Sequence, residues 1–125
     1  MAAPPPPALG TPRLYAYPAC STCRKAGAWL RDRHLKVEAF DITLQPPSLE
    51  ELRAALLQLG RARLFNTSGQ IYRALGAAAI KAMADEEALA ALARDGRLVK
   101  RPFLIAADGR IVTGFRPEEW QELLG

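Results

Sequence analysis

The residues that decide the fold are 14–31, which read LYAYPACSTCRKAGAWLR. The first four are typical of a short β-strand, Pro18 ends that strand, and residues 24–31 have a helical pattern. Cys20 and Cys23 therefore lie where a strand gives way to a helix. The free amide groups and the positive dipole at a helix N-terminus favour a thiolate over a thiol. We expect Cys20 to be a nucleophile and Cys23 to be within reach to resolve a mixed disulfide.

Two other uses of this Cys-x-x-Cys pair stay open at this point. A structural zinc site needs four ligands, whereas the whole chain has two cysteines and one histidine, His34. That count argues against a zinc site within one chain, and we expect neither a metal nor an organic cofactor. The pair could also be two packed, inert cysteines. Redox or nucleophilic use is the favoured interpretation, but the pair alone does not identify the reaction.

Length and composition predict one domain. The chain has 125 residues, half of them hydrophobic, which is enough for a packed core. Two cysteines are too few for a disulfide scaffold and fit a reducing compartment, so we expect a cytoplasmic protein. Residues 1–12 contain four consecutive prolines and no apolar signal segment, and we expect a disordered tail there. A single domain should then occupy residues 13–125.

The charge and hydropathy patterns argue against nucleic acid and against a membrane as partners. The net charge is +4, but no run of Lys and Arg exceeds two residues and aromatic residues are not interleaved with them. We therefore expect no direct nucleic acid binding, and a solubilising surface with one local anion site instead. No stretch is long and apolar enough for a membrane span, so no membrane partner is expected.

The remaining segments predict the element order βαβ, a helical segment, then ββα. Residues 36–42 alternate polar and apolar side chains and predict a strand parallel to the first. Ser48 and Glu51 form a capping-box pattern before a helix. Residues 61–96 predict helices only. Residues 103–114 predict a β-hairpin before a final helix. The predicted fold class is α/β, with a thioredoxin-like mixed four-stranded sheet and a helical insertion between its two halves.

Arg101 and Pro102 precede the predicted third strand. A proline at a strand start marks an edge, a bend or a cis bond. Thioredoxin-like folds place a cis-proline against the active cysteine, so Arg101 would direct its guanidinium toward the sulfur of Cys20. That planar group suits an oxyanion or a carboxylate. The alternative is an ordinary surface arginine.

Three further sets of residues carry structural predictions. Trp29 and Trp120 lie on amphipathic helices and are predicted core residues. Residues 66–68 (Asn-Thr-Ser) either cap the next helix or line the Cys20 site with amide and hydroxyl donors. Leu75, together with residues 71–72, is predicted to anchor that next helix.

Five segments resemble the arsenate reductase/Spx family of thioredoxin-fold proteins. They are YAYPACSTCRKA at 15–26, PPSLEEL at 46–52, FNTSGQIYRAL at 65–75, KRP at 100–102 and GF at 114–115. Together they span nearly the whole predicted domain. The resemblance is strongest to the Spx-related, arsenate reductase-like group.

The resemblance implies roles for particular residues. Cys20 would attack arsenate, while Arg101 and Arg116 would hold the oxyanion. The other candidate substrate-binding residues are Ser21, Thr22, Arg24, Asn66 and Pro102. The glutaredoxin-linked reductases have an arginine where this chain has Asn66, and usually a non-cysteine residue at the position of Cys23. The cysteine pair instead matches the Spx branch, where it forms a thiol/disulfide switch and some members bind the RNA polymerase α subunit.

These observations predict a thiol-disulfide oxidoreductase. Cys20 would attack an oxyanion such as arsenate, or a disulfide sulfur, and Cys23 would resolve the adduct. Glutaredoxin, thioredoxin or a low-molecular-weight thiol would restore the dithiol, and the protein is expected to be a monomer. The alternative is a redox-switched, Spx-like regulator that binds the RNA polymerase α subunit without turnover. A third reading is a family member that has neither role.

Overall fold

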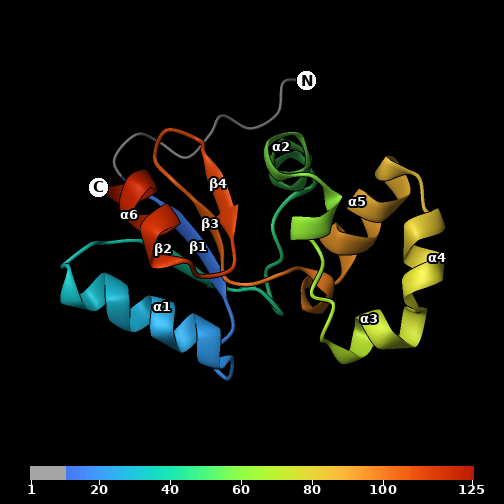
Figure 1. Ribbon diagram of the computed structural model, residues 1–125, viewed down its shortest axis with the longest axis horizontal. Helices are drawn as coiled ribbons and strands as arrows, with labels where there is room; N and C mark the ends of the chain where they lie inside the picture. The colour runs from blue at the N-terminus through green and yellow to red at the C-terminus, as the bar shows by residue number, and fades with distance from the viewer. Residues whose placement is uncertain (1–10) are drawn as a thin grey trace.

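Four strands form one mixed sheet in the order β2-β1-β3-β4. β1 pairs in parallel with β2 and antiparallel with β3, and β3 pairs antiparallel with β4. The strands are β1 Arg13–Ala16, β2 Glu38–Asp41, β3 Phe103–Ile105 and β4 Ile111–Thr113. This computed structural model describes residues 11–125 and confirms the predicted fold class (Figure 1). Most of the predicted tail lies outside the described residues, but the Pro12 carbonyl accepts a hydrogen bond from Glu38 N and extends the β1–β2 pairing.

Helices cover both faces of the sheet. They are α1 Ser21–Asp32, α2 Leu49–Leu59, α3 Gln70–Leu75, α4 Ala77–Ala82, α5 Asp85–Arg94 and α6 Pro117–Leu124, with short 3₁₀ turns at Arg61–Arg63 and Gly96–Leu98. In Figure 1, α1 and α6 lie on one side of the sheet, and α2 to α5 form a helical group on the other. The prediction that residues 61–96 are helical and contain no strand is confirmed. Phe65 alone forms an isolated antiparallel bridge, with Val99.

The period-two alternation of the strands divides the core into two clusters. On the α1/α6 face, the side chains of Leu14, Leu104 and Val112 pack with Trp29 and Trp120. The two tryptophans are therefore core residues, as predicted. Each fully buried large apolar side chain contributes about 1.5–3 kcal/mol relative to exposure, so this face is a main source of stability.

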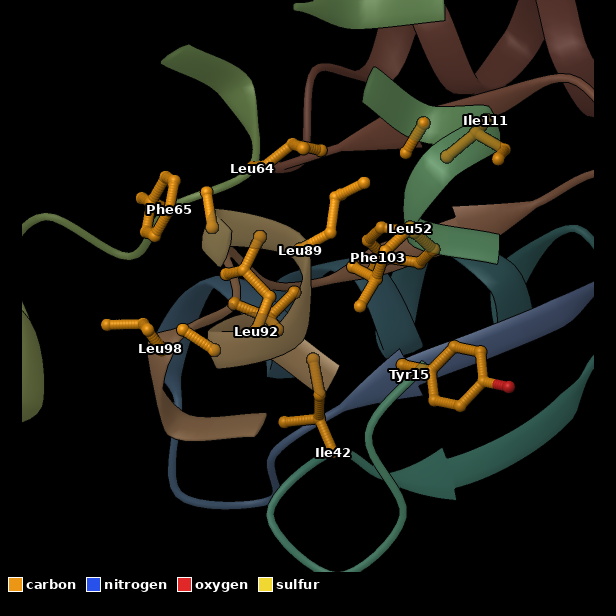
Figure 2. Packing of buried hydrophobic residues seen from close by; sticks show 14 of the residues in the cluster. Tyr15, Ile42, Leu52, Leu64, Phe65, Leu89, Leu92, Leu98, Phe103 and Ile111 are labelled. Atoms are coloured by element: carbon orange, nitrogen blue, oxygen red, sulfur yellow. The ribbon is translucent and has the colours of Figure 1, made fainter. Parts of the chain in front are cut away.

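The opposite face carries the larger cluster. Tyr15 and Phe103 of the sheet pack there with Leu52 of α2 and with Leu89 and Leu92 of α5. Figure 2 shows these side chains gathered between the sheet and the helices. The helical insertion is therefore part of the same core as the sheet.

The first turn of α2 is tied to β1. The predicted capping box is present: the Ser48 hydroxyl accepts from Glu51 N at 3.1 Å, and Glu51 Oε1 accepts from Ser48 N at 2.9 Å. The Tyr15 hydroxyl also donates to Glu51 Oε1 at 2.8 Å, and Arg13 Nη1 lies 3.0 Å from Glu51 Oε2. This network fixes the strand that leads directly to the cysteines.

A close backbone approach joins the end of the insertion to the segment after β2. Gly96 packs against the carbonyl group of Ile42, and a Cβ atom built on Gly96 would overlap it. Only glycine fits this contact without a shift of one of the two backbones.

Candidate active site

Cys20 lies at the mouth of α1. It is the N-cap residue, with extended backbone angles (φ −86°, ψ 122°), and its amide donates to the carbonyl of Tyr17 at 3.1 Å. Its carbonyl accepts from Arg24 N at 3.0 Å and so begins the helix. The side chain of Cys20 is partly exposed, whereas Cys23, one turn later, is 6% exposed. Both cysteines are free thiols.

A cavity of about 420 Å³ opens beside Cys20. Among residues 11–125, four cationic residues line it, Arg63, Lys100, Arg101 and Arg116, and no Asp or Glu does. Such a lining attracts anions, because the positive charges in it outnumber the negative ones.

Some of the predicted site residues line this cavity, and others do not. Those that line it are Cys20, Thr22, Asn66, Arg101 and Arg116. Ser21 and Arg24 are exposed and do not line it, because they occupy other directions around the first turn of α1. Cys23 and Pro102 are buried and lie outside its lining.

Arg101 is positioned by the start of β3. Its peptide bond to Pro102 is cis, and its guanidinium carbon lies 5.2 Å from the centre of the Tyr17 ring. Arg101 lines the same cavity as Cys20, and its side chain acts to lower the pKa of the Cys20 thiol. Arg101 is partly buried and belongs to the lining of the cavity.

The Asn66–Ser68 loop forms another wall of the cavity. The Asn66 side-chain amide donates to the Arg97 carbonyl at 3.3 Å and accepts from the Ser68 hydroxyl at 3.2 Å. Helix α3 begins after Gly69 with no side-chain cap, so of the two alternatives for residues 66–68 the capping one is wrong. The prediction that Leu75 anchors α3 in the core is also wrong, because its side chain is 45% exposed.

Two cationic residues were missed as site residues by sequence reasoning. Lys100 directly precedes Arg101, and that adjacency is a local signal that could have identified it. Arg63 has no such signal, because its partners are distant in sequence. Its guanidinium donates two hydrogen bonds to the Glu119 carboxylate, each at 3.0 Å, and a third to the Thr113 carbonyl at 2.6 Å.

Arg63 forms an ion pair with Glu119, which distinguishes it from the other three cations of the cavity. The hydrogen bonds from Arg63 hold the pKa of Glu119 below its usual range, so this pair remains charged at neutral pH. Among residues 11–125, Lys100, Arg101 and Arg116 form no salt bridge. These three side chains are thus the ones available to bind an anion next to Cys20.

The two thiols differ in their pKa values. Partial burial acts to raise the pKa of Cys20, but the amide and thiol of Cys23, the Arg101 side chain and the Thr22 amide together lower it. Burial raises the pKa of Cys23 to about 12, and the neighbouring Cys20 sulfur adds to the rise. The Tyr17 amide, which donates to the Cys23 sulfur at 3.5 Å, opposes it.

We therefore expect a single acidic thiol in the reduced protein. As the pH rises, thiolate absorbance in the ultraviolet should appear below the ordinary thiol range in the wild type and in Cys23→Ser. In Cys20→Ser it should appear only at alkaline pH, because burial still disfavours the Cys23 thiolate. An acidic thiolate that persists in Cys20→Ser would assign the nucleophile to Cys23.

Two other kinds of feature were sought in residues 11–125. Within that range, no three His, Cys, Asp or Glu side chains gather so that they could hold a metal ion. The helices in the same range are all too short or too polar to cross a membrane.

Comparison with known proteins identifies the family. The model of the ArsC family matches residues 15–123. The chain is 42% identical over 113 residues to the uncharacterised protein YusI of Bacillus subtilis, covering 87% of this chain and 94% of YusI. It is 27% identical over 113 residues to the global transcriptional regulator Spx of Enterococcus faecalis, covering 89% and 84% of the two chains.

A solved structure agrees with these relatives. The crystal structure of a possible arsenate reductase from Streptococcus mutans matches with a TM-score of 0.80 and 41% identity, over 89% of this chain and 98% of that one. The family model covers β2, β3 and β4, the second half of β1, the cysteine pair and the lining of the cationic cavity. The chain therefore belongs to the ArsC family of thioredoxin-fold proteins.

Proposed function

We propose that the protein is a cytoplasmic thiol-disulfide oxidoreductase that reduces an oxyanion such as arsenate, or a disulfide. The observation that carries this proposal is one cavity that contains both the Cys20 thiol and the unpaired cations Lys100, Arg101 and Arg116. A low-pKa thiol and an anion-binding lining are the two requirements for nucleophilic attack on a negatively charged substrate.

The first step is attack by the Cys20 thiolate. With arsenate, the sulfur forms a bond to arsenic(V), and a hydroxyl group of arsenate leaves as water after taking a proton. With a disulfide, the sulfur forms a mixed disulfide, and the other half of the substrate leaves as a thiolate. Arg101 and Arg116 neutralise the negative charge that would otherwise repel the Cys20 thiolate.

The second step is attack by Cys23 on the sulfur of Cys20. An intramolecular disulfide forms, and the electron pair of the broken bond stays with the leaving group, as arsenite or as a thiolate. The resting Cys23 holds its proton partly because of the neighbouring Cys20 sulfur. Once Cys20 is bonded to substrate it no longer carries negative charge, so the pKa of Cys23 should fall when its thiolate is needed.

The third step returns two electrons to the protein. A dithiol of glutaredoxin or thioredoxin, or two molecules of a low-molecular-weight thiol, would reduce the Cys20–Cys23 disulfide by thiol exchange.

A direct test is consumption of NADPH when reduced protein is given arsenate with glutathione, glutaredoxin and glutathione reductase. The same measurement with a disulfide, thioredoxin and thioredoxin reductase tests the other substrate class. Absence of turnover in both assays would contradict the proposal.

Arg101→Ala should lower kcat/KM by about ten- to a hundredfold, since a charge-assisted hydrogen bond to the substrate is lost. Arg101→Lys should also be impaired, because an ammonium cannot reproduce the planar fork. Arg73→Ala is the matched control, as Arg73 is exposed on α3 and does not line the cavity. Equal activity of Arg101→Ala and Arg73→Ala would remove Arg101 from the site.

A second function is favoured by the likeness to Spx. In this case the same cysteine pair would switch a regulator that binds the RNA polymerase α subunit without turnover. The test is binding of purified α subunit by the dithiol form, the disulfide form and Cys23→Ser. Binding that depends on the disulfide, together with no NADPH consumption, would favour the regulator over the enzyme.

A further inference from the structure

Tyr17 contacts three different residues of the cysteine site. Its carbonyl accepts from Cys20 N at 3.1 Å, and its amide donates to the sulfur of Cys23 at 3.5 Å. Its ring lies under the guanidinium of Arg101, with 5.2 Å between the guanidinium carbon and the ring centre. Tyr17 follows β1 directly, so the sheet sets its position.

The ring approaches Arg101 from outside the Cys20 cavity. Arg101 lines both that cavity and a neighbouring one of about 310 Å³, whereas Tyr17 lines only the neighbouring one. Arg101 therefore lies between the cavity that the Tyr17 ring lines and the cavity that Cys20 lines.

An aromatic ring and a carboxylate hold an arginine side chain in different ways. The guanidinium of Arg63 donates two hydrogen bonds to Glu119, and the Glu119 carboxylate also offsets the positive charge of Arg63. A ring attracts a cation through its quadrupole, without consuming N–H donors and without adding negative charge. Arg101 therefore keeps both its charge and its donors for the Cys20 site.

We propose that Tyr17 is a positioning residue of this site: its ring holds Arg101 against Cys20, while its backbone fixes both cysteines. The inference rests on the proposed function in taking Cys20 as the nucleophile. It adds that the Arg101 guanidinium is placed in advance by an aromatic ring. Ordering a long arginine side chain before substrate arrives lowers the entropic cost of binding.

The experiment is a thiolate titration of reduced full-length variants, without substrate. Tyr17→Leu removes the ring but keeps the backbone contacts, and Tyr17→Phe keeps the ring. Tyr17→Leu should lower the acid dissociation constant of Cys20 by about three- to thirtyfold, and Tyr17→Phe should match the wild type. Phe40→Leu is the matched control, because it removes a ring that lies 5.6 Å from a different arginine, Arg13.

A double variant separates positioning from general damage. Since Arg101 and the ring act together, Arg101→Ala with Tyr17→Leu should shift the Cys20 titration no further than Arg101→Ala alone. Additive shifts, failure of Tyr17→Phe to restore the titration, or an equal shift in Phe40→Leu would overturn the proposal. If Tyr17→Leu does not fold, as judged by circular dichroism, Tyr17→Met takes its place. Because no substrate is used, a failed titration is distinct from a lack of turnover.

Discussion

Cys20→Ser should lose reduction of both arsenate and disulfides by about a thousandfold or more. Every step of the proposed reaction passes through the Cys20 sulfur, and a serine hydroxyl at that position is not ionised at neutral pH. The fold should be unaffected, since the side chain is partly exposed and lines a cavity. Steady-state NADPH consumption measures the loss, and thermal unfolding checks the fold.

Cys23→Ser is the informative partner of that variant. It keeps the nucleophile and removes the resolving thiol, so one turnover should start and stop at a mixed disulfide on Cys20. Mass spectrometry after addition of a small disulfide should find one half of that disulfide attached to the protein. Mild oxidation of the wild type should give a loss of two hydrogens within one chain. Full turnover by Cys20→Ser, or attachment to Cys23 in the wild type, would reverse the two roles.

Gly96→Ala should destabilise the protein by about 3 kcal/mol, the upper range of overpacking in a core. The added methyl group would meet the backbone carbonyl of Ile42, which is not the flexible end of a side chain and cannot turn away. The connection between the insertion and the sheet would have to open. Urea denaturation monitored by circular dichroism measures the change as a lower midpoint.

Gly27→Ala is the control for this substitution. Gly27 lies within α1, and a methyl group there would meet only the mobile end of Arg31 at 3.4 Å. Alanine is the better helix former, so this variant should gain about 0.5–1 kcal/mol. If both variants change stability equally, the close approach to Ile42 is not the cause.

Local signals explain which parts of the molecule were predictable. The break at Pro18, followed by a helical pattern, placed Cys20 at a helix start, because both signals act within a few residues. The Ser48–Glu51 capping box is a local pattern of the same kind, and it is present. Alternating polar and apolar residues predicted the strand within 36–42, because neighbouring side chains of a strand point to opposite faces.

The parts that were not predicted depend on contacts between distant segments. Arg63 entered the cavity wall through a pair with Glu119, fifty-six residues later, and neither residue signals the other locally. Asn66 had two plausible local uses, and its actual partner is the Arg97 carbonyl, thirty-one residues away. Arg101 and Arg116 were predicted from the sequence, but the place of Arg63 in the cavity wall is evident only in the tertiary structure.

The walls of the cavity have separate origins in the chain, and this affects how such proteins can diverge. The two cysteines of the proposed reaction come from the first βα unit, whereas the cations come from residues 63–116. Substitutions in the later part can change which anion is accepted while the thiol machinery is inherited intact. Relatives with the same cysteine pair can therefore acquire different substrates, or exchange a substrate for a protein partner, without rebuilding the reactive centre.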